Sequence, residues 1–381
     1  MPTTIETAGY RHIKEVSLNF VRSMKLGPEV GIYRKEASEG ESLYGSYHGA
    51  HVLDMFNELQ KLPREVLDQW AAYFQRKQAD DGHFTNKPAD LQVTHAIDDM
   101  EPYWHCSRGC CWALRILGGR PLKPFRFMEP LLDAKALYRW VKGYDWSNSW
   151  AAGNQVLAAA TVLLAMRDWF GLSEVDEILE QGMYPALEEL IDPKTGYWGT
   201  HLGADLPNGL FGTIHVTPIY FAQGWPLRFL DRNVDSTIAC QLADGSYWPG
   251  GSDCPDFDGA YMMANLAELT TYRREDLDRA ARKYLQHALM HEDPQGCGWL
   301  LHRRGSTPDQ WRPRPHFIWR DGSRKVDIEL RDDDPSRTHI MLGSWFYPLS
   351  IAVITHMLGD TGYEGPWNLN RMSMHQCNVW K

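Results

Sequence analysis

The chain has 381 residues, of which 43% are hydrophobic and 23% are charged, a balance that suits one large folded domain and excludes intrinsic disorder. Its formal net charge is -10 and its basic residues are scattered, which argues against nucleic acid or an anionic membrane surface as a partner. We find no basic and apolar leader and no apolar run of about 18–20 residues, so we expect a cytoplasmic protein without a transmembrane segment.

Cysteines and aromatic residues bear on the interior of the protein. The seven cysteines are odd in number, and three of them crowd into "CSRGCC" (Cys106, Cys110 and Cys111), which favours reduced thiols over a disulfide framework. The 16 Trp, 17 Tyr and 13 Phe residues are typical of large helix-packing cores. Such side chains also line cavities that bind sugars or hydrocarbon cations.

Six apolar segments that open with small and aromatic residues are predicted to form helices of roughly three to four turns. In chain order they read "SLYGSYHGAHVLDMF", "PYWHCSRGCCWALRIL", "SNSWAAGNQVLAAATVLLAM", "GTIHVTPIYFAQGW", "CPDFDGAYMMANLAEL" and "GSWFYPLSIAVITHML". From Tyr44 to Ser344 they recur about every 60 residues, which is enough for a helical hairpin and its loops.

Charged helices and glycine turns separate these apolar segments. The stretches 64–78 and 274–290 are amphipathic with a wide polar face, as expected for an outer layer. Turns with a glycine and an aromatic residue recur in "QADDGHF", "DPKTGYW", "QLADGSYW" and "PQGCGW", and each is predicted to end one helix. The pattern predicts an all-α, single-domain (α/α)6-type toroid over residues 1–381.

Residues 305–337 are predicted to form an insertion or lid before the last apolar helix. The insertion contains the two candidate strands, "HFIWRD" and "KVDIEL", which favour a small β-hairpin. Its last part, "RDDDPSR", has three adjacent carboxylates that could bind Mg²⁺ for a diphosphate, although a solvated loop ending in a helix cap is the commoner outcome. We otherwise expect no cofactor.

One turn and the helix start after it resemble a known family. "QLADGSYW" followed by "PDFDGA" resembles the terpenoid cyclase and protein prenyltransferase superfamily. In its class II cyclases, such a turn precedes Pro-Asp-x-Asp-Asp-Thr-Ala; here Gly259 and Ala260 follow Asp258, so one carboxylate and a hydroxyl are missing. The resemblance implies acid-initiated cyclisation of an isoprenoid or related small molecule, with Asp258 as proton donor and Asp256 as its partner.

The prenyltransferase β subunit offers a second comparison within the same superfamily. It binds zinc through Asp, Cys and His, and Asp253, Cys254 and His339 are the matching residue types here. Their order and spacing fit poorly, and this activity would require a separate partner subunit.

The starts of the inner helices converge on one mouth of a toroid, where helix dipoles favour anionic groups. Besides the catalytic candidates Asp258, Asp256, His215, Tyr220 and Asn154, the side chains there are Tyr44, Tyr47, His48, Trp104, His105, Arg108, Trp150, Gln155, Arg337, His339 and Trp345, which we interpret as substrate-binding. So many donors and acceptors among aromatic rings suit a sugar better than a hydrocarbon cation.

The alternative function is therefore a carbohydrate-active toroid enzyme, namely a polysaccharide lyase, glycoside hydrolase or epimerase. In a lyase, Asn154 or Arg108 would neutralise a uronate carboxylate while His215 and Tyr220 exchange protons. The partner is then an oligosaccharide rather than a small isoprenoid. Structural roles compete throughout, since Asp256 can cap a helix and each histidine can bond a buried carbonyl. A non-catalytic binding toroid would keep the aromatics and not need Asp258.

Overall fold

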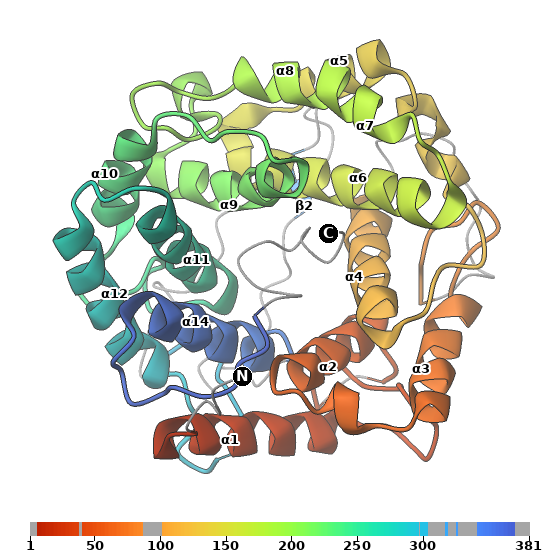
Figure 1. Cartoon of the computed structure of the whole chain (residues 1–381), viewed down its shortest axis with the longest axis vertical. Coiled ribbons are helices and arrows are strands. Elements are labelled where there is room, and N and C mark those ends of the chain that lie inside the picture. Colours follow the sequence, from red (N-terminus) through yellow and green to blue (C-terminus); the bar gives the residue numbers. More distant parts are fainter. Residues whose placement is uncertain are drawn as a thin grey trace.

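Helices of this protein lie in two concentric rings, as the computed structural model shows (Figure 1). The structure describes residues 6–37, 40–86, 101–296, 298–303, 317–318, 325–326 and 341–369, without the side chains of residues 101–105 and of the two strands. Successive helices follow one another around the ring, and the first helix packs against the last. The arrangement confirms the predicted α/α toroid.

The inner ring consists of the predicted apolar segments. Within the described residues its helices are α2 (Leu43–Met55), α4 (Glu101–Leu117), α6 (Ser149–Phe170), α9 (Leu206–Gln223), α11 (Asp253–Leu269) and α14 (Gly343–Leu358). Each contacts the next, and α14 contacts α2, which closes the ring. Helix α9 begins earlier than the apolar pattern indicates, because Asp205 caps it and accepts a hydrogen bond from the Asn208 N–H (2.8 Å).

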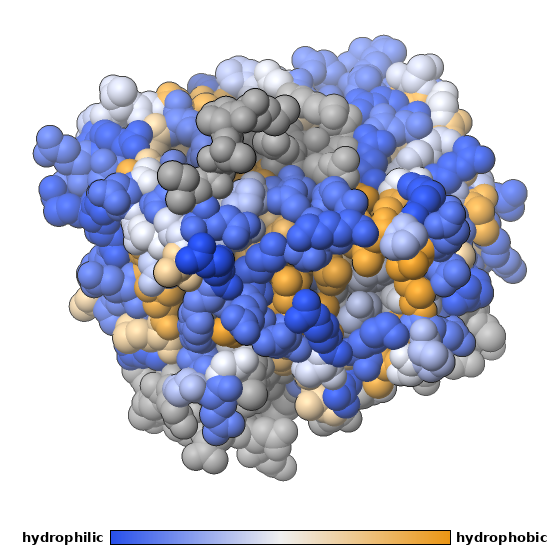
Figure 2. All heavy atoms as spheres, turned by 60° about the horizontal axis from the view of Figure 1, so that its bottom comes forward, coloured by the Kyte–Doolittle hydropathy of each residue, from blue (hydrophilic) through white to orange (hydrophobic). Residues whose placement is uncertain are grey.

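The outer ring is amphipathic, as predicted. Its helices are α1 (Ala8–Met24), α3 (Arg64–Arg76), α5 (Ala134–Lys142), α7 (Val175–Ile178), α8 (Tyr184–Glu188), α10 (Leu230–Cys240) and α12 (Arg274–Leu289), with a π-helical segment (Leu179–Met183) between α7 and α8. Short 3₁₀ turns occur at Leu59–Lys61, Arg126–Leu131, Trp146–Asn148 and Thr200–Leu202. Hydrophilic side chains cover most of the face seen in Figure 2, so the apolar sides of these helices turn inward.

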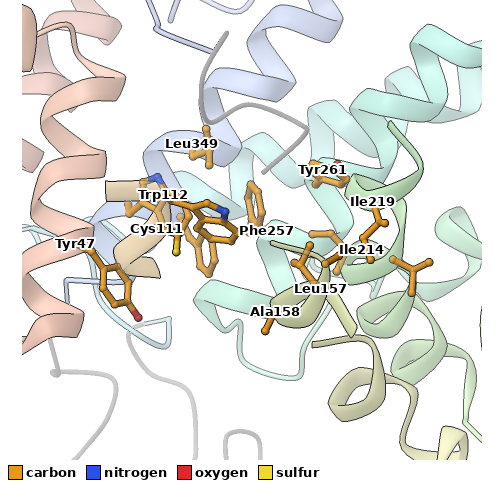
Figure 3. Close-up of a cluster of buried hydrophobic side chains, with 14 of the residues drawn as sticks. Tyr47, Cys111, Trp112, Leu157, Ala158, Ile214, Ile219, Phe257, Tyr261 and Leu349 are labelled. Atoms are coloured by element: carbon orange, nitrogen blue, oxygen red, sulfur yellow. The ribbon is translucent and has the colours of Figure 1, made fainter. Parts of the chain in front are cut away.

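Apolar side chains from every inner helix meet inside the ring. Figure 3 shows buried residues of these helices, among them Trp112 of α4, Phe257 of α11 and Leu349 of α14. Burial of one such large side chain stabilises the fold by roughly 1.5–3 kcal/mol. Because the inner helices are buried on most sides, their sequences are apolar around the whole helix rather than on one stripe.

The predicted glycine turns follow outer helices and lead the chain back toward the inner ring. Gly82, Gly196, Gly245 and Gly296 all have positive φ angles, of 97°, 74°, 96° and 68°. A Cβ atom at Gly245 would also lie 2.6 Å from the carbonyl oxygen of Lys283 on α12. Glycine is therefore required there both for the backbone conformation and for the close approach of α12.

Two short strands confirm the predicted β-hairpin, while the role of residues 305–337 as an insertion or lid stays a prediction. β1 (Phe317–Ile318) and β2 (Lys325–Val326) pair in antiparallel fashion, with Phe317 opposite Val326. They fall within "HFIWRD" and "KVDIEL", the two predicted strands. The "RDDDPSR" segment lies outside the described residues, so its possible Mg²⁺ site stays a prediction.

One helical stretch in the described part of the chain, Trp146–Phe170, is long and apolar enough to cross a membrane. Its most apolar window is 89% buried inside the protein. This stretch contains α6, and the central position of α6 in the inner ring accounts for its composition.

Candidate functional site

A cavity of about 200 Å³ lies inside the ring and receives side chains from all six inner helices or their caps. The residues that line it are Tyr44, Tyr47, His48, Arg108, Gly109, Trp112, Trp150, Asn154, Ile214, His215, Cys254, Phe257, Asp258, Leu342, Trp345 and Phe346. Those from α2, α6, α11 and α14 sit in or beside the first two turns of their helices. The positive ends of four helix dipoles therefore lie near the cavity.

Aromatic rings form much of the cavity wall. The rings of Tyr47 and His48 lie 4.4 Å apart, and His48 lies 5.1 Å from Trp345. The row of rings continues from Trp345 to Phe346 (4.6 Å), and Phe257 and Phe346 stack with their centroids 4.6 Å apart and their planes 8° from parallel. These flat surfaces line the cavity.

Among the described residues that line the cavity, Asp258 is the one with a carboxylic acid side chain. It lies in the second turn of α11, is 1% exposed, and its Oδ2 atom has no hydrogen-bond partner among the described residues. Burial raises the pKa of this carboxyl well above its usual range, and the nearby Asp256 and Asp253 raise it further. The side chain thus has an oxygen that none of the described residues satisfies.

Arg108 and Asn154 form a polar pair across two inner helices. The Nη1 atom of Arg108 on α4 donates a hydrogen bond to Oδ1 of Asn154 on α6 (2.8 Å). The guanidinium also lies over the ring of Trp112, 5.0 Å from its centroid. Arg108 is only 5% exposed, so its charge acts in a poorly hydrated environment where electrostatic interactions are stronger than in water.

His215 is held in one tautomer by the helix that carries it. Its Nδ1 atom lies 2.6 Å from the carbonyl oxygen of Phe211, which can only accept, so Nδ1 carries the proton and Nε2 has the lone pair. Burial lowers the pKa of His215 to about 3, and the positive charge of Arg108 contributes to the lowering. The imidazole is therefore neutral and can accept a proton or a hydrogen bond through Nε2.

Many predicted site residues meet at this cavity. The predicted residues in its lining are Tyr44, Tyr47, His48, Arg108, Trp150, Asn154, His215, Asp258 and Trp345. The side chains of Trp104 and His105, together with Arg337 and His339, lie outside the described residues. The cavity thus brings together residues as far apart in sequence as Tyr44 and Trp345, which were predicted to meet at one mouth of the toroid.

Three predicted residues have other surroundings. Asp256 accepts hydrogen bonds from the backbone N–H groups of Tyr247 (2.7 Å) and Ser252 (2.9 Å), which fixes the glycine-rich turn to the start of α11. Tyr220 donates to Glu188 (2.7 Å) of the outer layer. Gln155 is buried on α6. Asp256, Tyr220 and Gln155 are therefore not among the described residues that line the cavity.

Several lining residues were missed in the sequence because only polar groups at the helix starts were considered. Trp112 follows Arg108 by four positions on α4 and thus shares its face. Gly109 also lines the cavity, and glycine is required there because a Cβ atom would lie 2.6 Å from the Tyr47 ring. The other missed residues are Ile214, Cys254, Phe257, Leu342 and Phe346.

Comparisons with known proteins identify structural neighbours only. No family model matches the sequence, and no curated protein matches it. A glycosyl hydrolase of family 88 from Bacteroides vulgatus superposes with a TM-score of 0.53 at 12% identity, over 92% of this chain and 99% of that one. A polysaccharide lyase has a TM-score of 0.52 at 11% identity, over 93% and 99%. An α-1,6-mannanase from Salegentibacter sp. HEL1_6 has a TM-score of 0.49 at 14% identity, over 91% and 99%.

The expected kinship with terpenoid cyclases and protein prenyltransferases is wrong, because the structural neighbours are carbohydrate-active toroids. The structure explains why the turn repeat misled us. The Nε2 atom of Gln241 donates to the carbonyl oxygens of Gly245 (3.1 Å) and Ala280 (2.9 Å), so the glutamine of this turn joins it to the next outer helix. The repeat thus reports the toroid architecture and not a reaction.

Proposed function

We propose that the protein is a carbohydrate-active enzyme that cleaves an acidic sugar polymer by elimination inside this cavity. The observation that carries the proposal is the presence of Asp258, Arg108 and His215 in one cavity with aromatic walls. A proton donor, a cation and a neutral acceptor are the groups that such a reaction needs.

The composition of the cavity supports a sugar as ligand. Tyr44, Trp150 and Trp345 supply flat apolar surfaces, and His48 and Asn154 add polar atoms beside them. A pyranose ring has apolar C–H faces and a rim of hydroxyl groups, so it is complementary to both. An isoprenoid cation would instead meet several lone pairs that could quench it.

The charges of the lining support an acidic sugar. Among the described residues that line the cavity, Arg108 is the one with a permanent positive charge. The first turns of α2, α11 and α14 add the positive ends of their helix dipoles. A uronate carboxylate bound to Arg108 would form a charge-assisted pair with a planar guanidinium. The negative charge of such a ligand would also oppose the effect of Arg108 on His215, so the basicity of Nε2 would rise when substrate binds.

In the proposed reaction, Nε2 of His215 takes the proton from the carbon next to the uronate carboxylate. The electron pair of that C–H bond forms the new C=C bond, and the C–O bond to the leaving sugar breaks. Asp258 transfers its proton to the leaving oxygen. Arg108 and Asn154 stabilise the negative charge that develops on the carboxylate.

Hydrolysis by two carboxylates receives less support from the cavity. Glycosidases that work this way place two carboxyl groups about 5–10 Å apart across the scissile bond. Asp258 is the carboxyl group that the described lining provides, while Asp256 is engaged by the backbone of its own turn. An elimination requires a single acid together with a neutral base.

The experiment compares the wild type with Asp258→Asn on a panel of uronate-containing and neutral oligosaccharides. Asp258→Asn keeps the shape of the side chain and removes its transferable proton. We expect turnover of the uronate substrate to fall by about 100-fold or more, since general acid catalysis contributes about 10²–10⁴-fold. Asp68→Asn is the matched control, because Asp68 is exposed on α3 and pairs with Arg64 of the same helix, outside the cavity.

Thermal unfolding and calorimetric binding of the oligosaccharide accompany the assay. Normal folding, retained binding and lost turnover in Asp258→Asn would support the proton transfer. Full turnover in that variant would refute the role of Asp258, and turnover of neutral sugars alone would refute the acidic substrate.

A further inference from the structure

A second cluster of reactive side chains lies behind the cavity, between the start of α11 and the end of α12. Asp256, His287 and His291 are all fully buried, and one ligand atom from each lies within 4.8 Å of the others. None of the three is in the cavity lining among the described residues. We propose that Asp256, His287 and His291 bind one divalent transition-metal ion, with zinc as the probe, which joins α11 to α12.

The distances within the cluster fit one shared ion. His287 Nε2 lies 2.9 Å from Asp256 Oδ2 and 3.1 Å from His291 Nε2, and the remaining pair, His291 Nε2 and Asp256 Oδ2, is 4.0 Å apart. A tetrahedral zinc ion with bonds of about 2.0–2.2 Å separates its ligand atoms by about 3.3–3.6 Å. The three separations lie on either side of this range, so shifts of about half an ångström in the side chains would let all three atoms bind one ion.

The hydrogen bonds leave lone pairs that face one another. His291 Nδ1 lies 3.3 Å from the Leu300 carbonyl oxygen, so Nδ1 carries the proton and the Nε2 lone pair faces the cluster. A proton on His287 Nε2 can be donated either to Asp256 or to His291, but it cannot satisfy both. His287 Nδ1 has no partner among the described residues. A cation would be bound by all three ligand atoms at once.

The surroundings hold the ligands as a metal site requires. The backbone N–H groups of Tyr247 and Ser252 fix the Asp256 carboxylate, and the Leu300 carbonyl fixes the tautomer of His291. Such secondary hydrogen bonds orient the ligands of metal sites in proteins. The Tyr347 hydroxyl lies 3.4 Å from His291 Nε2 and donates to the Leu301 carbonyl oxygen (3.3 Å).

A glycine makes room for the two imidazoles. Gly251 has a φ angle of 77°, and a Cβ atom there would collide with the His291 ring and lie 3.0 Å from Cε1 of His287. Two imidazoles and one carboxylate are ligands that zinc and other first-row ions accept readily. The proposed metal site is independent of the proposed sugar chemistry. Asp256, His287 and His291 would bind the metal whatever ligand the cavity takes.

The test measures metal content and stability rather than activity. The full chain is stripped with a chelator, dialysed against Zn²⁺ and then against buffer, and its metal is counted by mass spectrometry. We expect one zinc ion per chain and a rise of about 5 °C in melting temperature when Zn²⁺ is in excess. Co²⁺ in place of zinc should give visible absorption bands with the pattern of a nitrogen and oxygen site.

The variants His287→Gln and His291→Gln should lose the bound ion and the rise in melting temperature. His12→Gln is the matched control, because His12 is exposed on α1 and pairs with Glu292 outside the cluster. If the two site variants fail to fold, the zinc content and the Co²⁺ spectrum of the wild type still decide. A wild type that retains no ion and is not stabilised by Zn²⁺ would overturn the proposal, as would equal zinc binding by His291→Gln.

Discussion

Buried histidines connect the stability of this protein to pH. His51 on α2 is 2% exposed, stacks on Trp345 with the ring centroids 5.0 Å apart, and neither of its ring nitrogens has a hydrogen-bond partner among the described residues. Burial lowers the pKa of His51 to about 3. The unfolded chain, with a histidine pKa of about 6.5, therefore binds a proton that the folded chain excludes between these two values.

We predict that His51 makes the folded state less stable as the pH falls below about 6.5. The loss continues down to about pH 3 and amounts to about 1.4 kcal/mol per pH unit at most. Asp253 acts in the opposite direction, because burial raises its pKa to about 7 and the folded state then binds the extra proton. The contribution of His51 is therefore measured as a difference between two proteins.

Urea unfolding of the wild type and of His51→Phe at pH 7 and pH 5 isolates this difference. The free energy of unfolding should fall less on acidification in His51→Phe, because phenylalanine keeps the stacking on Trp345 and cannot be protonated. His356→Gln, an exposed histidine of α14, serves as control and should behave like the wild type. Equal pH dependence in the wild type and His51→Phe would refute the buried neutral state.

The residues of the cavity were predictable from the sequence where the helix pattern was clear. Arg108, Asn154 and Trp345 were found because each lies near the start of an apolar helix. The partners of Asp256 were not, since His287 follows 31 positions later on an outer helix and nothing local connects the two. The spacing of four residues between His287 and His291 was the one available signal for the metal cluster.

At the scale of elements, Gln78 and Gln241, the glutamines of two of the repeated turns, each join their turn to a later segment of the chain. Gln78 follows α3 and is 4% exposed. Its Nε2 atom donates to the carbonyl oxygens of Gly82 and Lys123 (2.7 Å each), while its Oε1 atom accepts from the N–H groups of Leu122 and Lys123. The Gln78 side chain thus links the backbone of the turn to the backbone of the loop at Leu122 and Lys123.

We predict that Gln78→Ala destabilises the fold by about 3 kcal/mol, because two buried N–H groups and two carbonyl oxygens lose their partner. Gln181→Ala should change stability by less than about 0.5 kcal/mol, since Gln181 is exposed and its side chain bonds to the exposed Glu177 four residues earlier. Chemical denaturation of both variants measures the two free energies. A similar small loss in both would show that the repeated glutamine is not a structural brace.

The helices themselves were largely predictable, because each combines a periodic pattern of apolar residues with residues that end a helix. The apolar segments had helical lengths, and the turn glycines marked where outer helices end. The start of α9 was misplaced since its first turns, "LPNGLF", contain Pro207 and Gly209, which read as a loop. The Asp205 cap and the position of Pro207 in the first helical turn explain why these residues are helical.

At the scale of the whole molecule, the ring brings residues of all six inner helices to one cavity. Hairpins of about 60 residues, closed by α1 and α14, set residues from the whole sequence side by side (Figure 1). This architecture could be predicted from the repeat, whereas the chemistry could not, because the residues that distinguish a sugar from an isoprenoid are single side chains in the cavity. The mistaken family resemblance arose from treating a feature of architecture as a feature of function.

The mass of the product tests the central claim most directly. The wild type is incubated with a uronate-containing oligosaccharide in water enriched in heavy oxygen, and the fragments are analysed by mass spectrometry. Elimination predicts fragments whose masses add up to that of the substrate, with a C=C bond in one of them and no heavy oxygen incorporated. One heavy oxygen atom per cleavage would show hydrolysis and would contradict the proposed roles of His215 and Asp258.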